Sequence, residues 1–533
     1  LDPLPLEGQC FRNMEIALKG FLDKANNAAN KMNNRVVLIG ILPTISKKEL
    51  ELEFMTPNPR YHALNEMIRT LKGNDISLYI RGNDELSILH DSVLFEACNT
   101  SFQMHLQIRP DDFIASYNWA QAISGPLLGI ATNSPLLLGR ELWSETRIAL
   151  FQQSLDTRTS SYALKEQDAR VTFGNSWAHT SVVEMFKNDI ARHKIILHKD
   201  IDKNSLEELE QGRAPKLQAL NLHNGTIYHW NRACYGVENG KAHVRIENRY
   251  LPAGPSTPDE IANFAFWVGM MSGRPAEFDD MSNQMDFKDA KLNFIKTART
   301  GKESMLQWQD ELVSVQDLVI KNLLPIAHTG LKKAQVNPED IEYYLGIIEK
   351  RTHKSTGAQW CISNYRDLNK LHKKDDSLTM ITKAVYKNQQ TDLPVHEWPP
   401  VDRELEAHEA AYLVSHIMST DLLTLKVNDL AGLASSIMRW KNIHHLPVEN
   451  NEGQLCGLLT WAHMKKYQDI GEDTDMLLVA DIMIRDLLTV RPETEIKTAI
   501  YLMQRNEIGC LPVIQDRLLV GILTRNDIIP FLS

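Results

Sequence analysis

The C-terminal part of the chain contains one sequence unit twice. Residues 414–464 align with residues 479–529: Ile417-Met418 returns as Ile482-Met483, and Leu446-Pro447-Val448 returns as Leu511-Pro512-Val513. Both offsets are 65 residues, whereas Gly457 and Gly521 are 64 apart because the second copy has a shorter hairpin turn. An internal repeat constrains the architecture of its segment more than any other sequence feature. Two copies that are each too short to bury a core must pack on each other, and the cleft between them is a natural ligand site.

Each copy has the same order of expected elements. An apolar start leads to an amphipathic helix, two short strands around a turn, and a last helix that begins at Thr460 or Thr524. The recurring Leu-Pro-Val and Gly-x-Leu-Thr segments resemble the CBS domain, and two copies in tandem, at 414–466 and 479–533, resemble a Bateman module. This resemblance implies βαββα units that bind an adenine nucleotide (AMP, ADP or ATP). We also expect a homodimer through the pair.

The second copy carries the better nucleotide site. Thr524 opens a helix, so free backbone N–H groups and the helix dipole would meet a phosphate there, and Arg525 adds a positive charge. Asp527 offers a carboxylate to a ribose diol. The alternative is that Thr524 is only a helix N-cap. The first copy has Thr460 and His463 at the matching positions and lacks the acid, so its site is the weaker expectation.

Composition limits the class of protein. The chain has 533 residues and a net charge of −10, and it lacks the basic balance of a nucleic-acid or membrane-surface binder. No apolar run is long enough to span a membrane. The 6 cysteines form no CxxC pair, which favours a reducing, cytoplasmic location. Because the chain begins Leu-Asp-Pro, we expect it to be a piece of a longer protein.

The first 390 residues read as one α+β domain. A Pro-rich segment near 388–402 predicts a linker, which together with a lead-in helix covers 391–413. Alternation and β-branched runs predict five strands, at residues 34–43, 75–80, 102–108, 225–236 and 243–251. Helical periodicity predicts helices at residues 8–32, 59–71, 111–132 and 257–273. Several strands alternate apolar with charged side chains, which is typical of a sheet with one buried face and one functional face.

Two strands carry candidate site residues. Arg245, Glu247 and Arg249 share one face of their strand, where the glutamate could ligate a cation and the arginines could bind phosphate oxygens. The alternative is an exposed strand with cross-strand charge pairs. His105 and Gln107 also share a face; the alternative for the histidine is an ordinary sheet residue whose hydrogen bonds are satisfied.

A third segment, residues 131–147, follows an apolar helix and ends in a charged loop. Its residues Asn133, Ser134, Arg140 and Arg147 could bind a carboxylate substrate. The alternative is a Pro-containing helix break with solvated charges.

These segments, in this order, resemble the second glutamate–cysteine ligase family over most of residues 30–365. The resemblance implies a glutamine-synthetase-like antiparallel sheet with helices, and ATP-dependent ligation of glutamate to an amine through an acyl phosphate. It assigns Mg²⁺ ligands to Glu247, His105 and Gln107, and catalytic roles to Arg249, Arg245 and His105. It assigns substrate contacts to Arg60, Tyr61, Asn133, Arg140 and Arg147.

One departure from the family pattern has consequences for activity. The family opens with strands that bear clustered glutamates, and this chain has none of them. Two functions therefore stay open: a carboxylate–amine ligase regulated by adenine nucleotide at the repeats, or a non-catalytic regulatory or scaffold protein on a ligase-like fold. A different acceptor amine is a third possibility. We expect residues 1–533 alone to be a poor ligase because phosphate charge requires bound metal.

Overall fold

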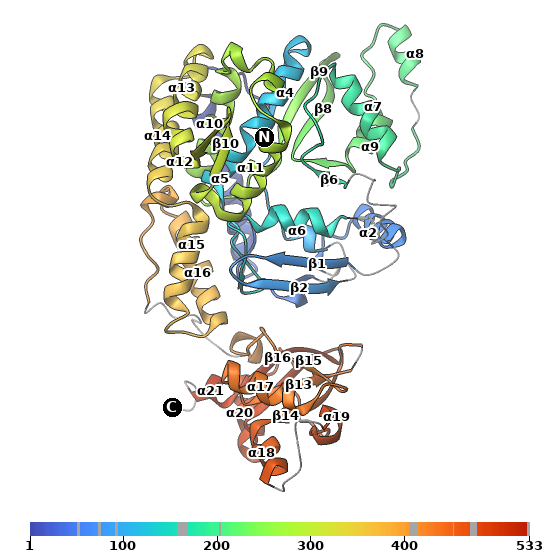
Figure 1. Ribbon diagram of the computed structural model, residues 1–533, viewed down its shortest axis with the longest axis vertical. Helices are drawn as coiled ribbons and strands as arrows, with labels where there is room; N and C mark the ends of the chain where they lie inside the picture. Colours follow the sequence, from blue (N-terminus) through green and yellow to red (C-terminus); the bar gives the residue numbers. More distant parts are fainter. Residues whose placement is uncertain are drawn as a thin grey trace. The chain divides into compact units, whose positions relative to one another are not determined.

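The computed structural model describes residues 1–50, 54–72, 76–90, 94–156, 169–201, 204–403, 413–450, 452–469 and 477–529. They form two compact units (Figure 1). The first comprises residues 1–45, 49–372 and 377–403. The second comprises residues 46–48, 373–376 and 404–533. Helices and strands are mixed in both, which confirms the expected α+β class.

An antiparallel sheet of three strands carries the predicted site residues. Its order is β3 (Met104–Ile108), β9 (Lys241–Asn248) and β8 (Asn231–Glu238), so β9 is central. One face is apolar: Leu106 lies opposite Ile246, which lies opposite Ala233. The other face is polar, as the alternation of the sequence predicts.

Helices cover the apolar face and form the core of the first unit. The 16-residue helix α10 (Thr257–Ser272) is buried on nearly every side, and it begins where the Ser256 side chain caps the backbone N–H of Asp259. It packs on α13 (Leu324–Lys333), α14 (Pro338–His353) and α1 (Cys10–Asn30). Figure 1 shows α10, α13 and α14 as one helical layer. The other helices of this core are α4 (Phe113–Ala122), α5 (Ser124–Ala131), α11 (Phe287–Thr300) and α12 (Val315–Leu318).

Smaller elements complete the first unit. The hairpin β1 (Ile76–Arg81) and β2 (Glu85–His90) packs on α6 (Thr146–Ser154). Two-stranded pairs are formed by β4 (Leu136–Leu137) with β5 (Arg140–Glu141), β6 (Val171–Thr172) with β7 (Tyr228–His229), and β10 (Met305–Trp308) with β11 (Glu311–Ser314). The remaining helices are α2 (Pro59–Lys72), α3 (Leu94–Ala97), α7 (Val182–Arg192), α8 (Ser205–Glu210) and α9 (Gln218–Asn224).

The strand predicted at residues 34–43 is wrong. Ile39 and Ile41 are buried and Leu42 is exposed, and among the described residues the backbone of this segment pairs with scattered groups and not with a strand. The Gln389 side chain binds both the N–H and the C=O of Leu38, and Gly40 donates its N–H to the Asn133 carbonyl. An apolar run predicts burial, whereas a strand also requires a partner edge, and this segment has no such edge.

The predicted linker begins later than its composition indicates. Helices α15 (Gly357–Leu368) and α16 (Lys374–Gln389) lead to a segment whose Val395 and Trp398 are buried in the first unit. Trp398 packs edge-to-face on Trp360, with ring centroids 5.2 Å apart. The division between the units falls after Arg403. Most of the expected lead-in helix, residues 404–412, lies outside the described residues.

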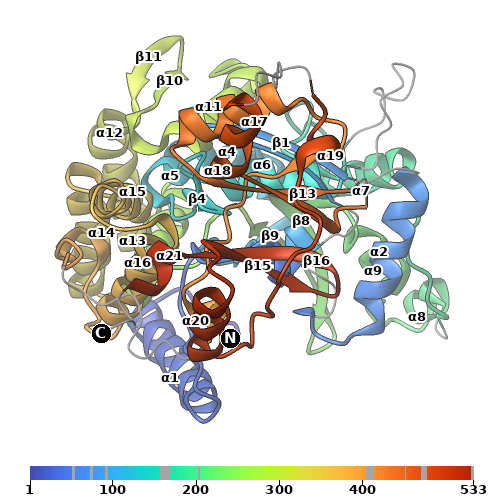
Figure 2. The ribbon, with the colours of Figure 1, turned by 90° about the horizontal axis from the view of Figure 1, so that it is seen from below.

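The second unit shows the repeat as structure. The first copy has β12 (Leu425–Lys426), α17 (Ala431–Lys441), β13 (His445–Glu449), β14 (Leu455–Thr460) and α18 (Trp461–Asp469). The second has α19 (Val479–Ile482), α20 (Ile496–Arg505), β15 (Cys510–Gln515), β16 (Leu518–Thr524) and α21 (Arg525–Ile528). Figure 2 shows β15 and β16 side by side, with α20 beside them.

The two copies exchange their leading segments. Ser419, near the start of the first copy, bridges to Ile522 in the second, and Ile484, near the start of the second, bridges to Leu458 in the first. A Cβ on Gly521 would lie 2.5 Å from the Met418 sulfur, and a Cβ on Gly457 would clash equally with Met483. Both glycines therefore allow a close approach, since an added Cβ would force the methionine side chain to shift, and the reciprocal contacts join the copies into one body.

Candidate functional site

The polar face of the sheet brings the predicted residues of β3 and β9 together. Cross-strand partners lie on one face, so His105 lies opposite Glu247 and Glu247 lies opposite Arg232. One step along, Gln107 lies opposite Arg245. Three arginines, one histidine and one glutamate therefore line this face, because Arg249 follows on the same side of β9.

Glu247 is the centre of this group. It is 2% exposed, and its Oε2 accepts a hydrogen bond of 2.6 Å from Arg232 Nε. Arg249 approaches the same oxygen to 3.8 Å, and His105 Nε2 lies 3.5 Å from the other. Burial acts to raise the pKa of Glu247, but the charges of Arg249, Arg232 and His105 outweigh it, so the pKa lies below its ordinary value. The glutamate is therefore ionised at neutral pH.

Arg232 was not predicted from the sequence. It belongs to the segment Asn231-Arg232-Ala233-Cys234 of β8, in which two polar residues are followed by two small ones. The signal that could have identified it is its place on an antiparallel neighbour of β9, directly opposite Glu247. That pairing depends on register, which is set by the β8–β9 turn and cannot be read from β8 alone.

The described residues do not form a complete magnesium site. They contain no group of three or more His, Cys, Asp or Glu side chains placed to hold one ion. The carboxylate of Glu247 already contacts two arginines, whereas Mg²⁺ requires six oxygen ligands in near-octahedral geometry. Burial lowers the pKa of His105, which keeps its imidazole neutral near pH 7. The face as described fits an anion better than a cation.

A second polar group lies beside the face, around Tyr228. The Arg249 guanidinium lies over the Tyr228 ring, 5.4 Å from its centroid. Burial and the charge of Glu96 raise the pKa of Tyr228, and the charges of Arg249, Arg60 and Arg170 oppose that rise. Arg60, from helix α2, is thus brought near the strand residues. Its neighbour Tyr61 is 38% exposed.

The other predicted substrate residues hold the backbone behind the face. Arg147 is 3% exposed; its NH1 lies 3.0 Å from Glu145 Oε1 and donates to the Tyr250 carbonyl. Asn133 is buried and donates to the Ala253 carbonyl over 2.8 Å. These contacts hold in place the backbone of the segment that follows β9, at Tyr250 and Ala253. Arg140 is half-buried in β5.

In the repeats, Asp527 is the buried acid at the start of α21. Its Oδ2 accepts hydrogen bonds from the Thr524 N–H (2.6 Å) and hydroxyl (2.7 Å), which forms a capping box. The N-cap alternative for Thr524 is therefore present in the structure. Lys373, which belongs to the same compact unit, contacts Oδ1. In the first copy, the Thr460 hydroxyl accepts from the His463 N–H at 3.1 Å.

Comparison with known proteins identifies the family. A profile described as glutamate-cysteine ligase family 2 matches residues 5–376, which is more than half of the chain. The chain therefore belongs to glutamate-cysteine ligase family 2. A profile of the CBS domain matches twice, at 414–469 and 479–533, which confirms the tandem pair.

The curated relatives match this chain over a short stretch. Inosine-5'-monophosphate dehydrogenase of Methanocaldococcus jannaschii is 27% identical over 25% of this chain and 26% of its own length. Homoserine O-acetyltransferase of Methanohalobium evestigatum is 34% identical over 22% of this chain and 23% of its own length. The chain thus spans about a quarter of the length of these curated relatives.

Solved structures similar to the chain cover a similar share of it. The structure of CBSX2 in complex with AMP is 26% identical, with 23% of this chain and 96% of that chain covered and a TM-score of 0.20. The CBS domain pair of protein MJ0100, in complex with 5-methylthioadenosine and S-adenosyl-L-methionine, is 28% identical. The match covers 23% of this chain and 96% of that chain, with a TM-score of 0.21. None of the described helices combines the length and apolar character of a membrane span.

Proposed function

We propose that this protein is an ATP-dependent carboxylate–amine ligase that forms an amide bond between glutamate and an amine, with adenine nucleotide bound at its CBS pair. Family membership supports the reaction class. The observation that carries the proposal is the polar face, where three arginines share one sheet face with an ionised glutamate. An excess of guanidinium groups in a partly dry site binds phosphate and carboxylate oxygens strongly.

The reaction needs this kind of face. A substrate carboxylate oxygen attacks the terminal phosphorus of ATP, the bond to ADP breaks, and an acyl phosphate forms. The amine nitrogen then attacks the acyl carbon, inorganic phosphate leaves with the bonding pair, and the nitrogen loses a proton. Arg249 and Arg245 would neutralise the transferred phosphoryl group, and the neutral imidazole of His105 would accept the proton.

Glu247 would orient the arginines as well as balance their charge. Its 2.6 Å bond to Arg232 Nε and its approach to Arg249 hold both guanidiniums against β9. The predicted role of Glu247 as a Mg²⁺ ligand stays a proposal, which requires carboxylates beyond the described set. In this scheme Asn133 and Arg147 position the chain after β9, and Arg60 lies nearest to the incoming carboxylate substrate.

The ligase proposal is tested by phosphate release. Wild-type protein is compared with Arg249→Gln in the presence of ATP, glutamate and a panel of amines that includes cysteine. We expect the variant to lose roughly 10²–10³ in rate, by analogy with loss of one charged transition-state contact. Arg109→Gln is the matched control because Arg109 pairs with Asp111 at the exposed surface. Equal rates for wild type and Arg249→Gln would reject the assignment.

A specific observation favours a second function. Both oxygens of Glu247 face positive or polar partners within the protein, and no further carboxylate joins it among the described residues. A non-catalytic, nucleotide-responsive regulatory protein would need no additional carboxylates on this face, because it would not have to hold a catalytic metal ion. Absence of phosphate release with every amine, both from residues 1–533 and from a form that carries the family's glutamate-bearing strands, together with nucleotide binding to the full chain, would select this alternative.

For the CBS pair we propose that the nucleotide ribose binds Asp527 and its phosphates lie near Thr524 and Arg525. Support comes from the double profile match and the buried carboxylate. Because Lys373 contacts the same carboxylate, the ribose would have to displace it. Lys373 directly precedes helix α16, so nucleotide binding would change the start of that helix.

We also propose a homodimer through the CBS pair. Helix α17 exposes an apolar stripe, with Leu433 48% and Trp440 79% exposed. Sedimentation velocity of wild type and Trp440→Ser tests this, and a wild-type monomer would reject it. The cytoplasmic location is supported by the six cysteines, all of which are free thiols.

A further inference from the structure

The last segment of the first unit is held on the helices of that unit by specific bonds. Residues 393–401, which we call the strap, end just before the boundary with the second unit. The indole N–H of Trp360 in α15 donates to the Pro399 carbonyl over 3.0 Å. The Val401 N–H donates to Asn364 Oδ1, also in α15, over 2.7 Å. The strap is therefore the docked end of the polypeptide that leads to the CBS pair.

One bond joins the strap to the start of helix α10. The Val395 N–H donates to Asp259 Oδ2 over 2.8 Å, and the Ser256 hydroxyl donates to the same oxygen over 2.8 Å. The other oxygen of Asp259 lies 3.2 Å from the Arg351 guanidinium of α14. Both charged side chains are almost fully buried, so the loss of any one partner leaves a charge that water cannot reach. Asp259 thus joins the strap, α10 and α14.

The start of α10 also holds the loop that follows β9. Glu260, the next residue of the helix, accepts the N–H of Gly254 at Oε1 over 2.6 Å. The backbone of the loop is closely packed there, because a Cβ on Gly254 would overlap the carbonyl oxygen of Leu38. This loop begins directly after Arg249 of the polar face. A shift of the start of α10 therefore moves the backbone that carries Arg249.

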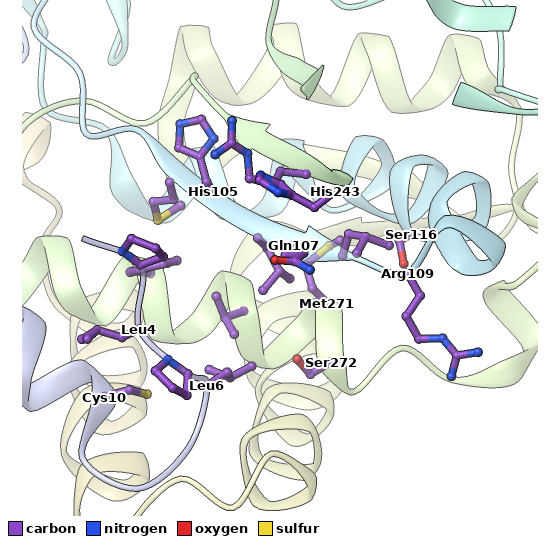
Figure 3. A pocket seen from close by; sticks show the side chains of 18 of the residues that line it. Leu4, Leu6, Cys10, His105, Gln107, Arg109, Ser116, His243, Met271 and Ser272 are labelled. Carbon is purple, nitrogen blue, oxygen red and sulfur yellow. The ribbon is translucent and has the colours of Figure 1, made fainter. Parts of the chain in front are cut away.

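Helix α10 reaches from the strap to the cavity beside the polar face. Its 16 residues give it a length of roughly 24 Å. Asp259 lies in its first turn, whereas Met271 and Ser272 at its other end line a cavity of about 1590 Å³. Figure 3 shows these two residues in the cavity wall with His105 and Gln107 of β3. A displacement at Asp259 thus reaches the cavity as well as the loop after β9.

The strap carries a buried histidine that lacks hydrogen bonds. His396 is 6% exposed, and neither ring nitrogen is hydrogen-bonded within the described part of the chain. Its Nε2 lies 3.4 Å from Glu397 Oε1. The other charged groups that face it are Asp259 of α10, and Arg351 and Lys354 at the end of α14. Burial lowers the pKa of His396, and the two cations act in the same direction against the two carboxylates. The docked strap therefore excludes a proton that a solvated imidazole takes up below about pH 6.5.

We infer that the strap is a conformational device that docks on α10 and α14 and can leave them, and that its docking fixes the loop after β9 and with it Arg249. The bond to Asp259 and the packing of Trp398 on Trp360 favour docking. Release is favoured by His396, whose ring nitrogens gain hydrogen bonds to water once they are exposed. Opposed contributions of this kind give an element with two states, which a distant event can bias.

The strap continues into the CBS pair, so it is the element through which nucleotide binding there would act on the polar face. This consequence rests on the proposed function, whereas the docking of the strap does not. Acid should release the strap, because the pKa of docked His396 lies below its ordinary value. Docking is then fully stable above about pH 6.5 and weakens as the pH falls. From pH 7.5 to pH 5.5, uptake of one proton on release favours the released state by up to about tenfold.

Hydrogen–deuterium exchange of the full chain tests this without ligase turnover. Labelling times are scaled for the intrinsic effect of pH on exchange. The strap and residues 250–256 should both exchange faster at pH 5.5 than at pH 7.5, by up to about tenfold, while the β1–β2 hairpin stays unchanged. His396→Gln and His396→Leu are neutral at both pH values and should each abolish the difference. His328→Gln is the matched control, because His328 lies on α13 beside Glu342, and it should keep the difference.

The outcomes separate the strap from the proposed function. Equal exchange of the strap at both pH values, or a pH response that survives both His396 variants, would overturn the proposal. A faster strap with an unchanged loop at 250–256 would overturn the coupling to Arg249. AMP is then added at pH 7.5. If exchange slows within residues 414–533, we expect the strap to change at least threefold, and an unchanged strap would overturn its role in transmission. No change within 414–533 would contradict the nucleotide site instead, and the pH comparison alone would then decide whether the strap is released.

Discussion

The bond between Arg232 and Glu247 makes a quantitative prediction about stability. In Arg232→Met the glutamate stays 2% exposed but loses its 2.6 Å partner, while the methionine keeps most of the apolar contact of the arginine stem. Removing one partner of a buried ion pair costs about 3–5 kcal/mol because the other charge is left uncompensated. Since Arg249 and His105 also approach Glu247, we expect the lower end, about 3 kcal/mol.

The pH dependence of this loss follows from the pKa of Glu247. The arginines hold that pKa below its ordinary value, so the glutamate contributes stability that is present above its unfolded-state pKa of ~4.3 and is lost as the pH falls. The difference between wild type and Arg232→Met should therefore be full at pH 7 and shrink below about pH 4. The double variant Arg232→Met/Glu247→Gln should recover part of the loss at pH 7, because the uncompensated carboxylate is removed, while the Arg249 guanidinium beside it remains.

Urea unfolding followed by tryptophan fluorescence measures these differences. Eight of the ten tryptophans belong to the first unit, so the signal reports the unit that contains the pair. Arg109→Met is the control: Arg109 and Asp111 pair at 2.5 Å, but their side chains are 83% and 64% exposed, and the change should be near zero. The reasoning is refuted if Arg232→Met costs no more than Arg109→Met, or if the double variant is as unstable as the single one.

Four further outcomes are expected. Glu247→Gln should slow any phosphate release coupled to ligation by roughly 10²–10³ while the circular dichroism spectrum is unchanged, and a rate within twofold of wild type would contradict its role. Calorimetry with AMP, ADP and ATP should show weaker binding for Asp527→Ala than for His463→Ala, and equal affinities would remove Asp527 from the site. Lys373→Ala should tighten nucleotide binding, because the competing contact with Asp527 is lost, and weaker binding would contradict the competition. Gly521→Val should lower the unfolding temperature of the second unit, since its Cβ would lie 2.5 Å from the Met418 sulfur, and an unchanged temperature would argue against that close approach.

The local sequence pattern predicted where strands and helices form better than it predicted which distant residues each segment bonds to. Alternation identified β3 and β9 and the face on which their charged residues lie, because the period of two is a property of each strand alone. The segment at 34–43 was misread as a strand, since its backbone bonds come from Gln389, about 350 residues away in sequence, and from Asn133. Partners so distant leave no trace in the local pattern.

The candidate site shows the same limit. Glu247 and Arg249 were found from their spacing, but Arg232 was not, because its role depends on the register between β8 and β9. Arg147 was expected to contact substrate, and the structure shows it buried against Glu145 and the Tyr250 carbonyl. The sequence indicates that an arginine is present, whereas its burial depends on the packing of elements from distant parts of the chain.

The two interpretations of Thr524 and Asp527 do not exclude each other. One carboxylate oxygen of Asp527 caps the start of α21 through Thr524, and the other contacts Lys373. The cap fixes the position of the carboxylate, so the second oxygen is presented to whichever group carries a hydrogen-bond donor, an ammonium or a ribose hydroxyl. A lysine ammonium and a ribose diol cannot both bind that oxygen. The lysine contact would therefore weaken nucleotide binding, and bound nucleotide would weaken the lysine contact by the same free energy. A helix cap and the proposed nucleotide site are thus compatible in one residue, and the contact with Lys373 would link nucleotide binding to the start of helix α16.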